Sequence, residues 1–462
     1  MKQAALSLFL ILLSGLVLCF MAINNGFPLA FNVDSQMYIS SAFTGVVRDD
    51  RPILYGLFIM FVSLRKSLWL VTIAQAILTS TMIYFYFRYS KNQVKKRLAP
   101  FYIAYIALVS FFMGASFEVG WLMSDVFASI FVLGIGLLLF YGNIKWYHHA
   151  LISFMTVLSI AMHNSHLYIC IILCSLLMAG FVFKSTRAKL FVVGITLKKV
   201  FYVLFLAVLS NVSLSLIQYS FNKQMAASKG GVVFLFGSFV EMGVIDKYLD
   251  ENCNRSNLKL CKFRDSIPSN FLWDQRSPLF KLGGWDKNRE EYSLILKNIV
   301  SSPKYWGIIA YKSTLLTLKQ FFQFDTGEAS KPWPIVNEAV EQYFPSDYSQ
   351  YISSRQNKEA LNFDFINFTQ RVIIAISLLT YIYEFLHKKM ASRYRYLMAF
   401  ILIVLVVNAW FCGTVSGVYP RYQSRLIWLV PLPLFIYLSD YTPLKRIRAL
   451  RFGQLLKYLG FN

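Results

Sequence analysis

Two histidines lie three residues apart in the short polar stretch HNSH, between two apolar runs of the chain. Polar residues in such surroundings are costly and usually have a task. His163 and His166 could hydrogen-bond a phosphate, act as acid or base, or bind a metal ion. Hydrogen bonding between packed helices is the structural alternative.

Two arginines lie four residues apart near the C-terminus, in the stretch RYQSRLIWLVPLPL. In a helix, Arg421 and Arg425 would share a face. Guanidinium groups suit bidentate contacts with phosphate. The structural alternative is a pair that extends along the membrane interface, with Arg425 the better fit to that role.

Acidic residues complete the set of candidates. Asp34 follows the first apolar run, and an ionised carboxylate at that place could accept a proton from a hydroxyl group. Asp125 begins another apolar run, where it could equally stabilise a helix N-terminus. Asp34 could likewise be an ordinary helix cap. Glu118 is a secondary candidate, and Arg51 opens a short apolar segment in the same loop as Asp34.

The chain that must position these residues is apolar overall. It has 462 residues, of which 56% are hydrophobic and 15% charged, and its mean hydropathy is +0.50. Soluble domains carry roughly 25% charged residues. The net charge of +23 is concentrated in clusters between apolar runs, a pattern typical of membrane topology and not of nucleic-acid binding. We therefore expect an integral membrane protein with membrane lipids, and no nucleic acid, as partners.

We assign ten apolar runs as approximate membrane spans, since about 20 residues cross the hydrocarbon core. The predicted fold is thus an all-α polytopic membrane protein. A further run at 52–63 is about half that length, and we interpret it as an interfacial or re-entrant helix. The predicted spans are 5–23, 67–87, 100–116, 122–141, 146–162, 167–183, 200–221, 365–385, 396–412 and 426–438.

Basic residues in the short loops predict which side of the membrane each loop faces. One set of loops is rich in basic residues, and the loops on the opposite side of the membrane contain far fewer basic residues. The contrast places both termini in the cytoplasm and the candidate residues on the outer face, typical of a bacterial inner-membrane protein whose site faces the periplasm or the outside. The basic set is Lys2, Arg88, Lys91, Lys95, Lys96, Arg97, Lys145, Lys184, Arg187, Lys189, Lys198, Lys199, Lys388, Lys389, Arg393, Arg395, Lys445, Arg446, Arg448, Arg451 and Lys457.

The same reasoning divides the chain into four parts. They are a membrane module at 1–221, an outer region at 222–364, further membrane helices at 365–440 and a basic cytoplasmic tail at 441–462. In the outer region, the stretch at 283–322 has helical periodicity, with Asp286 as a plausible cap.

Two of the six cysteines, Cys253 and Cys261, lie in the outer region. An oxidising compartment would make them a natural disulfide pair. The other four lie in apolar segments or at their ends and are interpreted as small core residues. They are Cys19, Cys170, Cys174 and Cys412.

The pattern resembles the GT-C superfamily of membrane glycosyltransferases. Members carry an acid in the first outer loop followed by an interfacial helix, as in NVDSQMYI and then RPILYGLF here. A second acid in the next outer loop is similar to Asp125 in LMSDVFASIF, and RYQSRLIWLVPLPL is similar to a late Arg-Tyr…Pro stretch. The resemblance implies a polyprenyl-phosphate-linked sugar donor, a glycan, lipid or protein acceptor, and transfer on the outer face.

On this resemblance we expect an inverting sugar transfer. Asp34 would take the proton of the acceptor hydroxyl, and Arg421, Arg425 and Arg51 would stabilise the departing phosphate. His163 and His166 would hold the phosphate or position the acceptor. Asp125 would orient one of these groups or help to hold a divalent cation, whose requirement the sequence leaves open.

Other functions remain open on the sequence. HNSHL resembles a His-Asn stretch of O-antigen ligases and polymerases, which also use outer-face arginines. A transporter or flippase of lipid-linked or anionic solutes is a non-enzymatic alternative, although transporters usually place charge near the bilayer midplane and contain repeated halves. A structural or assembly protein that binds through the outer region is a third class.

Overall fold

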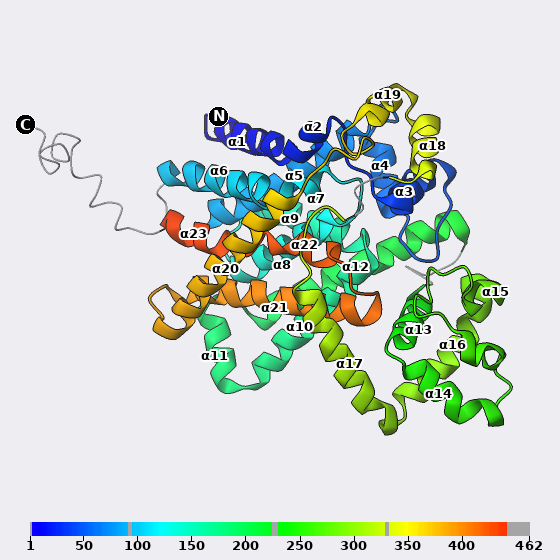
Figure 1. Cartoon of the computed structure of the whole chain (residues 1–462). Helices are drawn as coiled ribbons and strands as arrows, with labels where there is room; N and C mark the ends of the chain where they lie inside the picture. Colours follow the sequence, from blue (N-terminus) through cyan, green and yellow to red (C-terminus); the bar gives the residue numbers. More distant parts are fainter. Residues whose placement is uncertain (1, 91–94, 224–229, 329–331, 441–462) are drawn as a thin grey trace, which may run out of the picture.

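The fold is given by a computed structural model that describes residues 2–90, 95–223, 230–328 and 332–440. Over these residues the chain forms 23 α-helices and two short 3-10 helices (Figure 1). The same residues contain no β-strand, only an isolated bridge between Leu29 and Trp121. The predicted all-α class is confirmed for this part of the chain. The basic tail predicted at 441–462 lies outside the described residues.

Five helices are long and apolar enough to cross a membrane, and they indicate an integral membrane protein. Each coincides with a predicted span. A helix satisfies every backbone hydrogen bond within itself, which is why such runs fold this way in lipid. The five are α5 (Trp69–Tyr89), α10 (Asn164–Val182), α12 (Leu197–Asn222), α20 (Asp364–His387) and α21 (Ser392–Val415).

The other predicted spans are helical but shorter. The run at 5–23 is divided at Cys19, and the run at 426–438 is divided where Pro431 and Pro433 lack the backbone N–H that would continue a helix. The helices concerned are α1 (Lys2–Leu18), α2 (Phe20–Asn25), α6 (Lys95–Phe111), α8 (Val126–Phe140), α9 (Trp146–Ala161), α22 (Arg421–Ile427) and α23 (Leu432–Asp440), and α11 (Lys184–Val192) joins α10 to α12.

One end of the bundle gathers loops that the sequence predicts to be cytoplasmic. The Ser90 hydroxyl donates to the Asp440 carboxylate at 3.2 Å, joining the end of α5 to the end of α23. The guanidinium of Arg393, at the start of α21, lies 4.1 Å from the centre of the Tyr141 ring, just after α8. The helix ends that carry the candidate residues therefore lie at the opposite end of the bundle.

Three short helices lie at that opposite end of the bundle: α3 (Asn32–Thr44), α4 (Leu54–Val62) and α7 (Ala115–Gly120). The nine residues of α4 extend about 14 Å, too short to cross a bilayer. It packs closely on α3 because Gly56 has no side chain: a Cβ there would lie 3.0 Å from the Tyr38 carbonyl oxygen.

The outer region at 222–364 contributes to two hydrophobic cores. Buried residues between Val233 and Tyr305 form a core of their own, whereas those between Val336 and Tyr351 belong to the main bundle. The first core is built by α13 (Gly231–Glu241), α14 (Val244–Asn252), α15 (Pro278–Lys281), α16 (Gly284–Val300) and α17 (Pro303–Phe321), with the 3-10 helices η1 (Cys253–Arg255) and η2 (Lys259–Ser266); we call this the outer subdomain. The helices α18 (Pro334–Tyr343) and α19 (Pro345–Ser353) cover the bundle beside α3 (Figure 1).

The periodic stretch at 283–322 folds as two helices instead of one, because Ser301, Ser302 and Pro303 interrupt it and Pro303 begins α17. Asp286 lies in the first turn of α16, not at its cap. The cap position is taken by Gly283, whose φ of 101° favours glycine.

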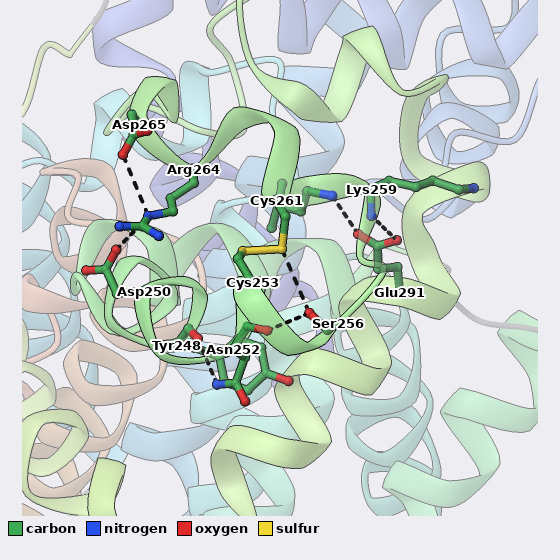
Figure 2. The surroundings of a disulfide bond; sticks show 11 residues. Tyr248, Asp250, Asn252, Cys253, Ser256, Lys259, Cys261, Arg264, Asp265 and Glu291 are labelled. Atoms are coloured by element: carbon green, nitrogen blue, oxygen red, sulfur yellow. Dashed lines mark hydrogen bonds and ion pairs between the residues drawn. A yellow bond between two sulfur atoms is a disulfide. The ribbon is translucent and has the colours of Figure 1, made fainter.

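The predicted Cys253–Cys261 disulfide is present in the outer subdomain (Figure 2). It closes a short loop between η1 and η2. The Glu291 carboxylate on α16 accepts hydrogen bonds from the backbone N–H groups of Lys259 and Leu260 at 3.0 and 2.9 Å. The disulfide loop is thereby fixed to the helix beneath it.

Candidate functional site

A cavity of about 330 Å³ lies where the bundle meets the outer subdomain. Asp34, Arg51, Asp125, His163 and Arg421 all line it, although they come from separate loops and helix ends. His166 and Arg425 do not. The other lining residues are Tyr38, Asp50, Met123, Ile160, Ala161, Asn164, Ser165, Leu167, Tyr168, Ser210, Asn211, Leu214, Gly231, Phe234, Trp273, Phe411, Val415, Ser416 and Tyr422.

Backbone contacts fix the segment that carries Asp34 against the one that carries Asp125. Leu29 donates its N–H to the Gly120 carbonyl and accepts from the N–H of Leu122, both at 2.8 Å. The Ser35 hydroxyl donates to the Leu122 carbonyl at 3.0 Å. These bonds hold the first turn of α3 beside the loop that precedes α8.

Asp34 lies between two arginines. One carboxylate oxygen is 2.8 Å from Arg51 Nη2 and the other is 2.8 Å from Arg421 Nη1. Arg51 also contacts Asp50 at 2.7 Å. The Asp34 side chain is 20% exposed, and those of Arg51 and Arg421 are 13% and 16% exposed, so these charges are mostly buried but border the cavity that they line. We call Asp34, Asp50, Arg51 and Arg421 the mouth cluster.

The electrostatics of the mouth cluster favour ionised groups. Burial alone would raise the pKa of Asp34, but the Arg51 and Arg421 guanidiniums outweigh it and hold that pKa well below its ordinary value. A carboxylate in this state is a poor base. Its basicity therefore depends on how strongly the two arginines remain paired with it.

Arg421 is oriented by its surroundings. Its backbone N–H donates to the Glu328 carboxylate at 3.0 Å, and its guanidinium lies 4.7 Å from the centre of the Phe31 ring. Its Nε–H has no hydrogen-bond partner among the described residues. Arg421 thus retains a donor beyond those used for Asp34.

Arg425 and Asp125 form a second ion pair with different access. The contact is 3.0 Å, and the side chains are 0% and 2% exposed. Arg425 also donates to the Asn408 side-chain oxygen at 3.0 Å. A charge pair so enclosed is held by its own hydrogen bonds, because leaving either partner alone would be costly. We call this the core pair.

The two histidines occupy different places. His163 caps α10: its Nδ1 accepts from the backbone N–H of Ser165 at 3.2 Å, which places the proton of the neutral ring on Nε2. Burial, reinforced by neighbouring arginines, holds the pKa of His163 well below its ordinary value. It therefore meets the cavity as a neutral ring. His166 is fully buried, donates from Nδ1 to the Ser159 carbonyl at 2.8 Å and stacks on Phe131.

Glu118 is buried behind the cavity, on α7. It accepts a hydrogen bond from the Ser424 hydroxyl at 2.7 Å. Burial, followed by the charge of nearby Asp125, raises the pKa of Glu118 to about 8. This carboxyl group is thus largely protonated at neutral pH and does not line the cavity.

Several residues at the site were not candidates on the sequence. Asp50 pairs with Arg51, Glu328 accepts from the backbone of Arg421, and the Asn164 side chain donates to the Asp50 carbonyl at 3.2 Å. The charges of Asp50 and Glu328 are ordinary for loops, so their tertiary partners alone distinguish them. For Asn164, the polar run HNSH was the available signal.

Within the described part of the chain, no group of three or more His, Cys, Asp or Glu side chains is arranged to bind a metal ion. Comparison with known protein families, with curated proteins and with solved structures found no match. The chemistry of the site must therefore be argued from its own residues.

Proposed function

We propose that this protein is a membrane glycosyltransferase of GT-C type, which transfers a sugar from a polyprenyl-phosphate-linked donor to an acceptor on the extracytoplasmic face. The observation that carries the proposal is the composition of the cavity. Its charged part is the mouth cluster, and its apolar part includes Leu214 of α12, Tyr168 of α10 and Phe411 of α21. One ligand that fits both parts has a phosphate and a lipid chain.

The arginines suit the phosphate. Arg421 and Arg51 present guanidinium groups to the cavity, and such groups bind phosphate oxygens in bidentate fashion. In the free protein, Asp34 forms an ion pair with each of these two guanidinium groups. A donor phosphate would compete with Asp34 for Arg421, whose buried Nε–H has no hydrogen-bond partner among the described residues and is a further donor.

This competition would also activate the base. Once a phosphate draws Arg421 away from Asp34, the pKa of the carboxylate rises, and Asp34 becomes able to accept a proton. The acceptor oxygen then bonds to the anomeric carbon as the bond from that carbon to the phosphate oxygen breaks. The hydroxyl proton passes to Asp34, and the phosphate leaves with the bonding electrons and is stabilised by Arg421 and Arg51.

The remaining candidates would position these groups. His163, as a neutral ring with Nε2–H, suits hydrogen bonding to a phosphate oxygen better than acid catalysis. Asp125 and Arg425 pair with each other, and Arg425 lies within 3.4 Å of the Ser165 hydroxyl. His166 supports the same helix end from the packed interior.

The topology supports transfer on the extracytoplasmic face. The cavity lies at the end of the bundle opposite the basic loops, and the subdomain beside it contains the disulfide. Disulfides persist in oxidising compartments. With ten spans and cytoplasmic termini, the mouth cluster would face the periplasm or the outside of a bacterial inner membrane.

The decisive experiment compares wild type with Asp34→Asn in lipid nanodiscs, using polyprenyl-phosphate sugars as donors and cell-envelope material as acceptor. We expect the variant to lose about 10²–10⁴-fold in transfer, the contribution of a positioned base. Asp265→Asn is the matched control, because that carboxylate is 95% exposed in the outer subdomain. Transfer by Asp34→Asn at the rate of the control would refute the assignment.

A ligase or polymerase of the O-antigen type is the second candidate, favoured by the position of His163 in the cavity. It would use a lipid-linked O-antigen glycan as the donor in place of a polyprenyl-phosphate-linked sugar. Supplying both donor types to the same nanodiscs separates the two enzymes. Appearance of labelled donor inside sealed vesicles, without transfer, would instead indicate a transporter.

A further inference from the structure

Three aromatic residues of the outer subdomain meet beside the cavity. Phe234 lies on α13, Trp273 in the loop before α15, and Trp285 in the first turn of α16. The ring centre of Phe234 is 5.3 Å from that of Trp285 and 6.4 Å from that of Trp273. The two indoles are 6.5 Å apart. We call these three residues the aromatic cluster.

The aromatic cluster is continuous with the mouth cluster. Phe234 and Trp273 line the same cavity as Asp34. The Gly230 N–H donates to the Asp49 carbonyl at 2.8 Å, which docks the start of α13 on the first outer loop. A Cβ on Gly230 would lie 3.2 Å from the Trp285 ring, so the aromatic cluster packs directly against this junction.

The part of the cavity lined by the aromatic cluster differs in chemistry from the part lined by the membrane helices. Trp273 is 45% exposed, and polar groups of Asn164, Asp50 and Ser165 line the cavity with it. Broad aromatic faces beside hydrogen-bonding groups match a pyranose ring, which has an apolar C–H face and a rim of hydroxyls. A lipid chain would not need hydrogen-bonding groups beside it, and the apolar lining from α10, α12 and α21 already offers it a binding surface.

We propose that the aromatic cluster binds a saccharide acceptor and presents one of its hydroxyl groups to Asp34. The inference rests on the proposed glycosyl transfer and narrows its acceptor from glycan, lipid or protein to a glycan. Trp273 is the main contact surface, and Phe234 and Trp285 support it.

Trp273 can be replaced without disturbing its loop, because other residues anchor that loop. The neighbouring Phe271 and Leu272 are 0% and 2% exposed and hold the segment in the core of the outer subdomain. Trp306, which is 56% exposed on α17 and does not line the cavity, provides a matched control of the same residue type.

The test measures binding directly, so that it does not depend on transfer. The full-length protein in nanodiscs is titrated with oligosaccharides released by mild acid from the envelope glycan of the cells that carry it, and saturation-transfer NMR reports contact. We expect Trp273→Ala to weaken binding at least about tenfold, consistent with the loss of an aromatic contact. Trp273→Phe should retain most of the affinity, and Trp306→Ala should match wild type.

Two results would overturn the inference: no oligosaccharide binding by the wild type, or equal binding by Trp273→Ala and Trp306→Ala. In the transfer assay, Trp273→Ala should raise the acceptor KM and leave kcat and the donor KM unchanged. If the wild type transfers no sugar yet binds saccharide through Trp273, the proposed function fails while the saccharide site stands. If transfer occurs and Trp273→Ala leaves the acceptor KM unchanged, the function stands and the saccharide site fails.

Discussion

Arg421 and Arg425 lie one turn apart on α22, and each pairs with an aspartate, but the two pairs differ in their access to the cavity. Asp34 and Arg421 are 20% and 16% exposed, whereas Asp125 and Arg425 are 2% and 0% exposed. Both contacts have ordinary ion-pair lengths of 2.8 and 3.0 Å. Distance alone therefore does not separate them, and the difference lies in what else can reach the charges.

The comparison separates an exchangeable ion pair from a fixed one. A ligand that enters the cavity can replace Asp34 as the partner of Arg421. Asp125 lines the cavity, but Arg425 does not and is 0% exposed, so a ligand could replace Asp125 as its partner only by opening the packed interior, where an unpaired charge is strongly unfavourable. The mouth cluster is thus suited to binding and chemistry, and the core pair to holding α8, α21 and α22 in register.

Loss of the core pair should have the largest effect on stability. We expect Arg425→Ala to lower the free energy of unfolding by about 3–5 kcal/mol, since it leaves the Asp125 charge buried alone. The unfolding temperature in detergent measures this. The double variant Arg425→Met/Asp125→Leu should recover much of the loss, and a double variant as unstable as Arg425→Ala would count against the fixed-pair interpretation.

Loss of the exchangeable pair should instead affect binding. We expect Arg421→Ala to weaken binding of a polyprenyl-phosphate sugar by about 10–100-fold, corresponding to roughly 1.5–3 kcal/mol for a charge-assisted contact. Its unfolding temperature should stay near that of wild type. Equilibrium binding of labelled donor provides the measurement. Donor affinity unaltered in Arg421→Ala would show that the phosphate is bound elsewhere.

The pH dependence of transfer sharpens the comparison. Arg421 is one of two guanidiniums that lower the pKa of Asp34, so its removal should raise that pKa. A lower pKa keeps the carboxylate ionised to lower pH, so the wild type should remain active further into the acid range. The acid limb of kcat/KM should therefore move to higher pH in Arg421→Ala. Coincident acid limbs would mean that Asp34 is not the group that titrates.

Glu118 should have the smallest effect on transfer, because it does not line the cavity, and its replacement should change the pH dependence of stability instead. Its pKa is about 8, above the ordinary value of a glutamate, so folding favours the protonated form. That contribution to stability is complete below pH 4.5, the ordinary pKa of a glutamate, and is lost progressively as pH rises from there to about 8. Glu118→Gln should therefore be nearly neutral at pH 4 and more stable than wild type at pH 8 and above. A stability difference between the two proteins that stays constant across this pH range would refute the assignment.

Much of the helical framework follows from the sequence because long apolar runs leave a chain in lipid few alternatives. The breaks are harder to predict. Pro431 divides one predicted span by an evident local rule, whereas the division at Cys19 has no local cause that we can identify. The helix pair α16 and α17 follows the predicted periodicity but is separated at Ser301–Pro303.

The candidate site is only partly readable from the sequence. Spacing and loop position select Asp34, His163 and Arg421, which line the cavity together. They do not show that Arg425, one turn further along α22, faces the packed interior. Residue spacing and loop position do not predict the aromatic cluster, because Phe234, Trp273 and Trp285 come together only when the outer subdomain folds.

The ion pair between Asp34 and Arg421 joins residues 387 positions apart. During synthesis, Asp34 leaves the ribosome long before Arg421, and until then Arg51 is the only arginine of the mouth cluster available to it. The proposed donor site is thus completed only after α22 has been synthesised. If the proposed function holds, a chain interrupted before α22 would lack Arg421 and would bind the lipid-linked donor only weakly, so incomplete chains would not compete for it.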